Sequence, residues 1–352
     1  MDRCMSSYLI EGYRNVSGEH CGSTAMRNLL QHYCGLELTE EEVFGLGSGL
    51  DFLIMETELF APGTLMFGRG PTMEVDATDA LAVDYQEQIE MDDERAWKVV
   101  KGEVLAGRPT MLSGDIFYLD YRKSKVHFPA HRYVLVGFED DKETAWIADR
   151  RDPEPQACSY VGLRKSRNPP DFMSTFNTWG KFYGTEVGRS LPEAFEHAIG
   201  KTVSRMRGES TGHTQIFELV ARGKPFQLTT GLAGLERLRD MIPDWAASEH
   251  APQSAGYAAK CIEAFGTGGG NFRNLYAGFL RSAHEHVPHL VGESTHQIAR
   301  QAAELWTQLS KAFGELAKSP ESFDVAATQA LVDSIIQSES RLVDVLAAAP
   351  PR

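Results

Sequence analysis

The residues best suited to chemistry surround Cys21, in the sequence Gly-Glu-His-Cys-Gly-Ser-Thr-Ala at positions 18–25. The cysteine stands where a loop is expected to become a helix, and the unpaired N–H groups at the start of a helix favour a thiolate. Gly22 would let a substrate carbonyl approach the backbone, where the Cys21 amide can face a developing oxyanion. Because an unpaired cysteine is more often simply buried, this motif indicates a nucleophile without establishing one.

A thiolate nucleophile needs a base, and His131 is the best placed of the eleven histidines. It begins the strand-like segment 131–138, whose rigid end can hold an imidazole near sulfur. Asp149 ends the next strand-like segment, 144–149, and the two segments are predicted to pair as a hairpin. Their open ends would then lie side by side, so that Asp149 accepts a hydrogen bond from His131 and fixes its tautomer. The sequence therefore predicts a Cys21–His131–Asp149 site.

Each of the two partners also has a structural interpretation. His131 can be a half-buried structural histidine, and Asp149 can begin a turn. His127 and Asp152 are the local rivals, but both lie close to a proline in segments that hold a side chain less rigidly. His20 adjoins the cysteine in sequence and is expected to point elsewhere. The order of a cysteine, a strand-borne histidine and a strand-borne aspartate favours the catalytic interpretation.

The elements that must position these residues follow from the spacing of apolar residues. Up to about residue 165 the pattern is mixed, with Gly35 marking the end of the helix that begins at the cysteine. Helices are expected at 21–33, 39–45 and 94–106, and strands at 51–55, 65–68, 109–113, 131–138 and 144–149. The acidic stretch Glu74–Glu94 holds nine carboxylates and no Lys or Arg, which is typical of a solvated loop and helix face.

Helical spacing dominates after Pro169 and Pro170. Seven helices are expected, at 192–206, 213–221, 231–241, 256–265, 272–286, 295–316 and 325–348. We therefore predict an α+β protein with two domains, a catalytic domain of residues 1–165 and an all-α domain of residues 166–352.

Composition limits the class of protein. The net charge of -14 makes nucleic acid a poor partner and suits a cationic small molecule better. Five scattered cysteines without a CxxC pair argue against a disulfide framework and against a structural zinc site, so no metal is expected. Neither a secretory signal nor an apolar run long enough for a bilayer is visible, so a cytoplasmic protein without a membrane partner is expected.

Two glycine-rich stretches are further candidate contacts with a substrate. The first, 45–49, follows a helix instead of a strand and lacks the last glycine of a dinucleotide fingerprint, so a tight loop near the active site is favoured. The second, 266–270, precedes a helix whose N-terminus can bind a phosphate, although a plain turn is as good an interpretation. The candidate contacts in these stretches are Gly47, Ser48, Gly268, Gly269, Asn271 and Arg273.

The order of Cys21, His131 and Asp149 resembles the papain-like superfamily, with a C39-peptidase-like N-terminal domain. In that superfamily a glutamine shortly before the cysteine completes the oxyanion hole. Asn15 stands six residues upstream here, so the resemblance assigns this role to Asn15, beside the Cys21 amide. A shorter amide reaches less far, which puts the assignment in doubt.

Three motifs resemble the butirosin biosynthesis protein H family more narrowly: 18–25, Val-Phe-Gly-Leu-Gly-Ser-Gly at 43–49, and His-Arg-Tyr-Val-Leu-Val-Gly at 131–137. The helical half, with Gly-Thr-Gly-Gly-Gly-Asn-Phe-Arg at 266–273, resembles the uncharacterised domain that accompanies it. The resemblance implies an acyltransferase of antibiotic biosynthesis, a branch of secondary metabolism. An acyl group would pass from the phosphopantetheine thioester of an acyl carrier protein, through an acyl-S-cysteine, to a small-molecule amine, with no cofactor bound by the protein itself.

Other functions remain open at this point. An amine of the tethered chain can attack intramolecularly and release a lactam. A cysteine peptidase or amidase would use the same three residues on water, and the lack of a propeptide and of an export signal disfavours it. A third interpretation is a non-catalytic binding module, against which the presence of all three site residues counts.

Overall fold

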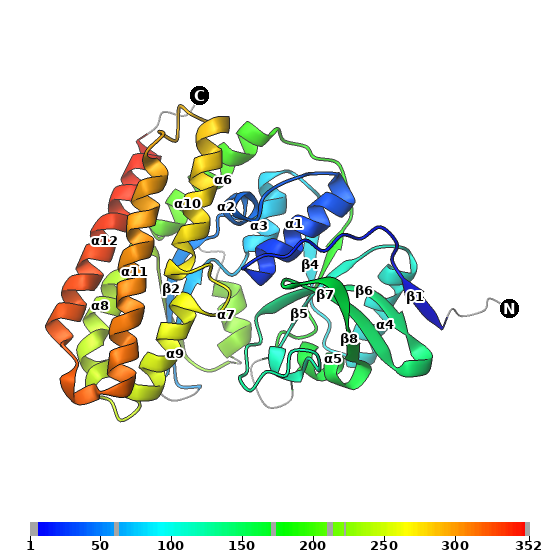
Figure 1. Cartoon of the computed structure of the whole chain (residues 1–352), viewed down its shortest axis with the longest axis horizontal. Coiled ribbons are helices and arrows are strands. Elements are labelled where there is room, and N and C mark those ends of the chain that lie inside the picture. The colour runs from blue at the N-terminus through cyan, green and yellow to red at the C-terminus, as the bar shows by residue number, and fades with distance from the viewer. Residues whose placement is uncertain (1–5, 60–62, 170–173, 210–213, 222, 349–352) are drawn as a thin grey trace. The chain divides into compact units, whose positions relative to one another are not determined.

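Helices and strands both contribute to the structure, a computed structural model that describes the chain except for residues 1–5, 60–62, 170–173, 210–213, 222 and 349–352 (Figure 1). Helix accounts for 53% and strand for 18%, which confirms a mixed α and β protein. None of the helices in the described part of the chain is both long enough and apolar enough to cross a membrane.

Contacts divide the chain into two compact units, and neither is continuous in sequence. The first unit comprises residues 1–40 and 82–188, and the second comprises residues 41–81 and 189–352. The contacts group residues 41–81 with residues 189–352. The single domain boundary expected after residue 165 stays a prediction.

The first unit is built on a seven-stranded sheet in the order β4-β9-β5-β6-β7-β8, with β1 also paired to β6. All of these described pairs are antiparallel. The strands are β1 (Ser7–Leu9), β4 (Tyr85–Gln88), β5 (Thr110–Gly114), β6 (His131–Glu139), β7 (Thr144–Asp149), β8 (Asp152–Ser159) and β9 (Trp179–Phe182). The expected hairpin is confirmed as β6 and β7, with Val134 opposite Ala148.

Three helices accompany this sheet: α1 (Cys21–Cys34), α4 (Asp93–Leu105) and α5 (Tyr160–Arg167). Gly35 ends α1 in a left-handed conformation, the stop that its sequence predicts. The core of the unit joins Val100 and Val104 of α4 to Leu112 and Leu135 of the central strands. Because these side chains are fully buried or nearly so, they fix the strands that carry the candidate site.

The second unit contains a small antiparallel sheet of β2 (Leu50–Thr57), β3 (Thr64–Arg69) and β10 (Phe226–Thr230), in the order β10-β2-β3. The all-α expectation for residues 166–352 is therefore wrong, since that segment supplies β9 to one sheet and β10 to the other. The strand β10 is only five residues long and none of its side chains is fully buried, so its signal is weak beside those of long helices.

Helices make up the rest of the second unit, and α8, α9, α11 and α12 run side by side around one apolar core (Figure 1). The helices are α2 (Glu40–Leu46), α3 (Met73–Ala80), α6 (Leu191–Met206), α7 (Thr214–Ala221), α8 (Gly231–Ala247), α9 (Ala251–Glu263), α10 (Arg273–His286), α11 (Thr295–Lys318) and α12 (Val325–Ala347). Glu40, the first residue of α2, is counted with the first unit. Residue 213, the expected start of α7, lies outside the described residues.

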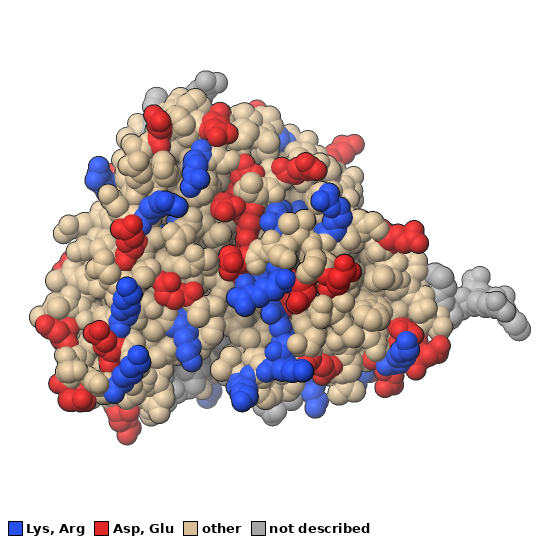
Figure 2. All heavy atoms as spheres, in the orientation of Figure 1, with Lys and Arg blue, Asp and Glu red and all other residues tan. Residues whose placement is uncertain are grey.

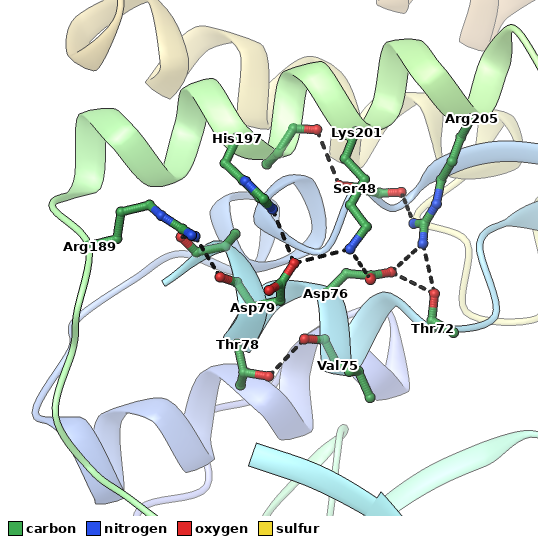
Figure 3. A network of polar contacts seen from close by, with 12 residues as sticks. Ser48, Thr72, Val75, Asp76, Thr78, Asp79, Arg189, His197, Lys201 and Arg205 are labelled. Carbon is green, nitrogen blue, oxygen red and sulfur yellow. Dashed lines mark hydrogen bonds and ion pairs between the residues drawn. The ribbon is translucent and has the colours of Figure 1, made fainter. Parts of the chain in front are cut away.

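Carboxylates of α3 explain why residues 41–81 belong with the C-terminal helices. Asp76 is buried and accepts from Arg205 at 2.6 Å, from Lys201 at 2.7 Å and from Thr72 at 2.6 Å (Figure 3). Lys201 also contacts Asp79 at 3.2 Å. The expected solvated acidic face is therefore wrong at this position, because the cations that neutralise it come from α6, far away in sequence.

Candidate active site

The structure brings Cys21, His131 and Asp149 together within the first unit. Nε2 of His131 lies 3.0 Å from each carboxylate oxygen of Asp149, and the Cys21 thiol is within hydrogen-bonding reach of the same imidazole. Since Nε2 faces the carboxylate, the other ring nitrogen is the one left for sulfur. All three side chains are buried. This arrangement is the one that the sequence predicts, and its catalytic role stays a prediction.

Charge pairing sets the protonation of the imidazole and the carboxylate. Burial by itself lowers the pKa of His131, but Asp149 and Cys21 outweigh it and raise the pKa to about 9. Burial by itself raises the pKa of Asp149, but His131 and Arg122 outweigh it and hold that pKa well below its usual range. At neutral pH the pair is therefore an imidazolium and a carboxylate, and an imidazolium beside a cysteine favours the thiolate.

Three further groups contact the Asp149 carboxylate. Two of them are side chains that the sequence did not single out. Tyr121 donates to Oδ2 at 2.9 Å, Arg122 Nε lies 2.9 Å from the same oxygen, and the backbone N–H of Arg150 donates to Oδ1 at 2.7 Å. Burial first, and then the charge of Asp149, raise the pKa of Tyr121 well above its usual value, so it stays a donor. Tyr121 and Arg122 lie in an irregular segment between β5 and β6, where no periodic pattern points to them.

The turn before Cys21 is tied to the end of β7 as well. The N–H of Gly18 donates to the carbonyl of Arg150 at 2.8 Å, and the Arg150 guanidinium donates back to the carbonyl of Glu19. His20 then caps α1, because its ring accepts from the Ser23 N–H at 3.2 Å. Adjacent residues at the end of one strand thus hold both the histidine and the nucleophile turn.

Asn15 is placed differently from the role that the resemblance implies. Its Nδ2 donates to the carbonyls of Asp149 at 2.7 Å and Asp152 at 2.5 Å, and its Oδ1 accepts from Asn28 of α1 at 2.8 Å. Both amide hydrogens are therefore engaged with backbone. This geometry favours Asn15 as a brace between α1 and the end of β7. An oxyanion role for the backbone amide of Cys21 stays a prediction.

The rival residues take other partners. His127 contacts Asp115 at 2.6 Å, and Asp115 is fully buried at the end of β5. His20 contacts Ser23, so it points away from the role of base, as expected. Asp152 begins β8 and contributes its carbonyl to Asn15. None of these three is found between Cys21 and Asp149.

Candidate contacts in the first glycine-rich stretch are buried. Gly22 lies in the first turn of α1, next to the thiol. Gly47 packs so closely on Met73 that a Cβ would lie 2.4 Å from its carbonyl oxygen, and Ser48 donates to the carbonyl of Ala198 at 3.2 Å. Both Gly47 and Ser48 belong to the second unit, whereas Cys21 belongs to the first. Substrate contacts at Gly22, Gly47 and Ser48 stay predictions.

The second glycine-rich stretch offers no accessible cation for a phosphate. Arg273 is fully buried, where it pairs with Glu339 at 2.6 Å and donates to the carbonyls of Gly68, Asp51 and Asn271. Asn271 is buried as well, with a left-handed φ of 52°.

The neighbouring glycines also serve the loop itself. Gly269 donates to Thr267 at 3.1 Å, and Gly268 accepts from Asn274 at 3.2 Å. The packing thus argues for a structural loop in place of the expected phosphate site at Gly268, Gly269, Asn271 and Arg273.

Comparison with known families identifies both halves of the chain. Residues 20–150 match the model described as butirosin biosynthesis protein H, N-terminal, and residues 163–346 match the domain of unknown function DUF4872. The chain therefore combines an N-terminal domain of the butirosin biosynthesis protein H family with a DUF4872 domain. No curated protein matches it. The first match spans all three residues of the candidate site, and the family's name associates it with the biosynthesis of an antibiotic.

Members of this family are thereby implied to be biosynthetic enzymes. In the described part of the chain, no three or more His, Cys, Asp or Glu side chains form a group that could hold a metal ion. On the face displayed in Figure 2, carboxylates and basic side chains are interspersed, so the net charge of -14 is not gathered into one patch there.

Proposed function

We propose that this protein is a cysteine-dependent acyltransferase of antibiotic biosynthesis with a papain-like catalytic domain. The observation that carries the proposal is the contact of His131 with both Cys21 and Asp149. A thiol activated by an oriented imidazole is the recurring arrangement of acyl-transfer enzymes that work through a covalent intermediate. The family match supports a biosynthetic role for this arrangement.

The first half of the reaction loads the enzyme. The Cys21 thiolate attacks the carbonyl carbon of the donor thioester, and the N–H of Cys21 stabilises the oxyanion. When the tetrahedral intermediate collapses, the bond to the donor sulfur breaks and that sulfur takes the proton of His131. The products are an acyl-S-cysteine and the free donor thiol. One thioester replaces another, so this step is nearly isoenergetic.

The second half forms an amide. A neutral amine attacks the acyl carbon, the now neutral His131 accepts the proton that the nitrogen loses, and the bond to Cys21 sulfur breaks. This restores the thiolate and imidazolium. Asp149 stabilises the imidazolium at both stages without accepting its proton, because its own pKa is held low.

The donor that we propose is the phosphopantetheine thioester of an acyl carrier protein, and the acceptor is a small-molecule amine or an amine of the tethered chain itself. No cofactor bound by the protein takes part, and the chemistry suits a cytoplasmic enzyme. The acidic composition suits a cationic acceptor. The family match supports the biosynthetic setting.

The products formed from acyl-carrier-protein thioesters test this function. Wild-type enzyme with a panel of acyl carriers and amines is analysed by mass spectrometry of the small molecules. We expect an amide or a lactam, formed by wild type and by the matched control Cys34→Ala but not by Cys21→Ala. Free acid as the main product at saturating amine would instead identify a hydrolase, the cysteine peptidase or amidase alternative.

A further inference from the structure

A buried carboxylate lies directly beneath the turn that bears the nucleophile. Glu40 is only 7% exposed, and its two oxygens face the backbone just before Cys21. Oε2 accepts from the N–H of Glu19 at 2.9 Å, and Oε1 accepts from the N–H of His20 at 2.6 Å. The two peptide groups that lead into the cysteine are therefore anchored to a single side chain.

Two hydroxyls of the first turn of α1 converge on the same carboxylate. Ser23 Oγ and Thr24 Oγ1 each donate to Glu40 Oε1 at 3.1 Å. Gly18 completes the enclosure, because a Cβ at this position would lie 2.5 Å from Glu40 Oε2. Four donors from both sides of Cys21 thus share one acceptor group.

This arrangement has a definite physical consequence. Hydrogen bonds to an ionised acceptor are stronger than bonds between neutral groups, and a carboxylate at a helix N-terminus is further stabilised by the exposed N–H groups. A glutamine at position 40 would present an NH₂ group to donors, leaving at least one buried N–H or O–H without an acceptor. The turn would then have to move, and Cys21 would move with it.

We propose that Glu40 is a positioning residue that holds Cys21 at hydrogen-bonding distance from His131. The Arg150 guanidinium and carbonyl hold the same turn from the end of β7, so the nucleophile is fixed on two sides. The inference rests on Cys21 being the nucleophile of the proposed function, and it extends the site to a residue that acts through the turn before the cysteine.

Alkylation by iodoacetamide, followed by peptide mass mapping of each cysteine, tests this role without any acyl donor. We expect Glu40→Gln to slow alkylation of Cys21 at neutral pH by about tenfold and to raise the pH at which it becomes fast. Loss of a negative charge near sulfur would by itself favour the thiolate, so slower alkylation reports lost geometry. Glu37→Gln, an exposed glutamate on the same segment, should leave both quantities unchanged.

The buried Cys158 reports the integrity of the fold in the same samples. If Cys158 stays protected and Cys21 of Glu40→Gln is alkylated as fast as in wild type, or faster, the proposal is overturned. If Glu40→Gln exposes Cys158, Thr24→Val replaces it, removing one of the four donors with little change of shape. We then expect a two- to threefold slowing at Cys21, and an unchanged rate would overturn the proposal. If alkylation of Cys21 depends on Glu40 in this way but the wild-type protein transfers no acyl group, the proposed function is refuted and the positioning role of Glu40 stands.

Discussion

At the scale of single residues, the imidazole of His131 links the other two residues of the candidate site. Its pKa of about 9 keeps it protonated at neutral pH, and it lies between a carboxylate and a thiol. A cysteine beside a protonated imidazole is a nucleophile before any substrate arrives, whereas a cysteine beside a neutral one must first be deprotonated.

Asp149→Asn should break this charge pairing. Without the carboxylate, burial dominates and the pKa of His131 falls from about 9, so less imidazolium is present at neutral pH. We expect the rate of acyl transfer to fall by at least about 100-fold. The measurement is the pH profile of the single-turnover rate of enzyme loading, with Asp152→Asn as the matched control. An Asp149→Asn profile that coincides with wild type would contradict the assignment.

The same pairing predicts how stability depends on pH. The pKa of His131 is raised in the folded state, from about 6.5 to about 9. Its contribution is therefore fully present below about pH 6.5 and is lost as the pH rises through about 9. A shift of this size corresponds to at most about 3 kcal/mol. Urea unfolding of wild type and His131→Gln should show a difference in unfolding free energy that shrinks over this window. A difference in unfolding free energy that does not change with pH would contradict the raised pKa of His131.

At the scale of elements, the end of β7 is the most informative part of the fold. Asp149 orients the histidine, Arg150 holds the turn before Cys21, and Asn15 ties this strand end to α1. One strand end thus sets the relative positions of the nucleophile helix and the base. A brace made of backbone carbonyls has no sequence signature, because it depends on which backbone comes near, not on a residue type.

Asn15→Ala separates the two roles considered for Asn15. As a brace, it should lose about 1 to 3 kcal/mol of unfolding free energy through its three hydrogen bonds. Urea unfolding and the rate of enzyme loading are measured on the same variant. Unchanged stability together with a rate lowered by about 100-fold would instead support the oxyanion role implied by the resemblance.

Strong local patterns predicted much of this architecture. The hairpin of β6 and β7 has two dense β-branched and aromatic segments around a polar turn, and α1 has helical spacing and a glycine stop, so both were predictable. Several short elements were not predicted, and among them the helices α3 (Met73–Ala80) and α5 (Tyr160–Arg167) bury acidic or basic residues. Their pairing partners lie far away in sequence, where local spacing carries no information.

At the scale of the whole molecule, the chain leaves its first contact unit after residue 40 and returns at residue 82. The glycine-rich loop at Gly47 and Ser48 therefore folds with α6 instead of with the nucleophile helix. The change in composition after residue 165 predicts a boundary there, but composition does not report which segments of a chain pack together.

A fragment of residues 1–165 tests whether the continuous catalytic domain expected from the sequence folds by itself. It lacks β9, the strand to which β4 pairs in the described sheet, and β10, which pairs with β2. A hairpin of β2 and β3 alone is marginal in water. We expect the fragment to unfold without a cooperative transition in circular dichroism, whereas the full chain unfolds cooperatively. A cooperative transition with a dispersed amide spectrum would instead support the continuous catalytic domain expected from the sequence.

In the proposed reaction Cys21 carries the acyl group. The most direct measurement is a rapid-quench incubation with an acyl-carrier-protein thioester and no amine, followed by peptide mass mapping. We expect one acyl adduct, on the peptide that contains Cys21, in wild type and in Cys34→Ala, and none at any position in Cys21→Ala. An adduct that persists in Cys21→Ala, or that maps to another residue in wild type, would contradict it.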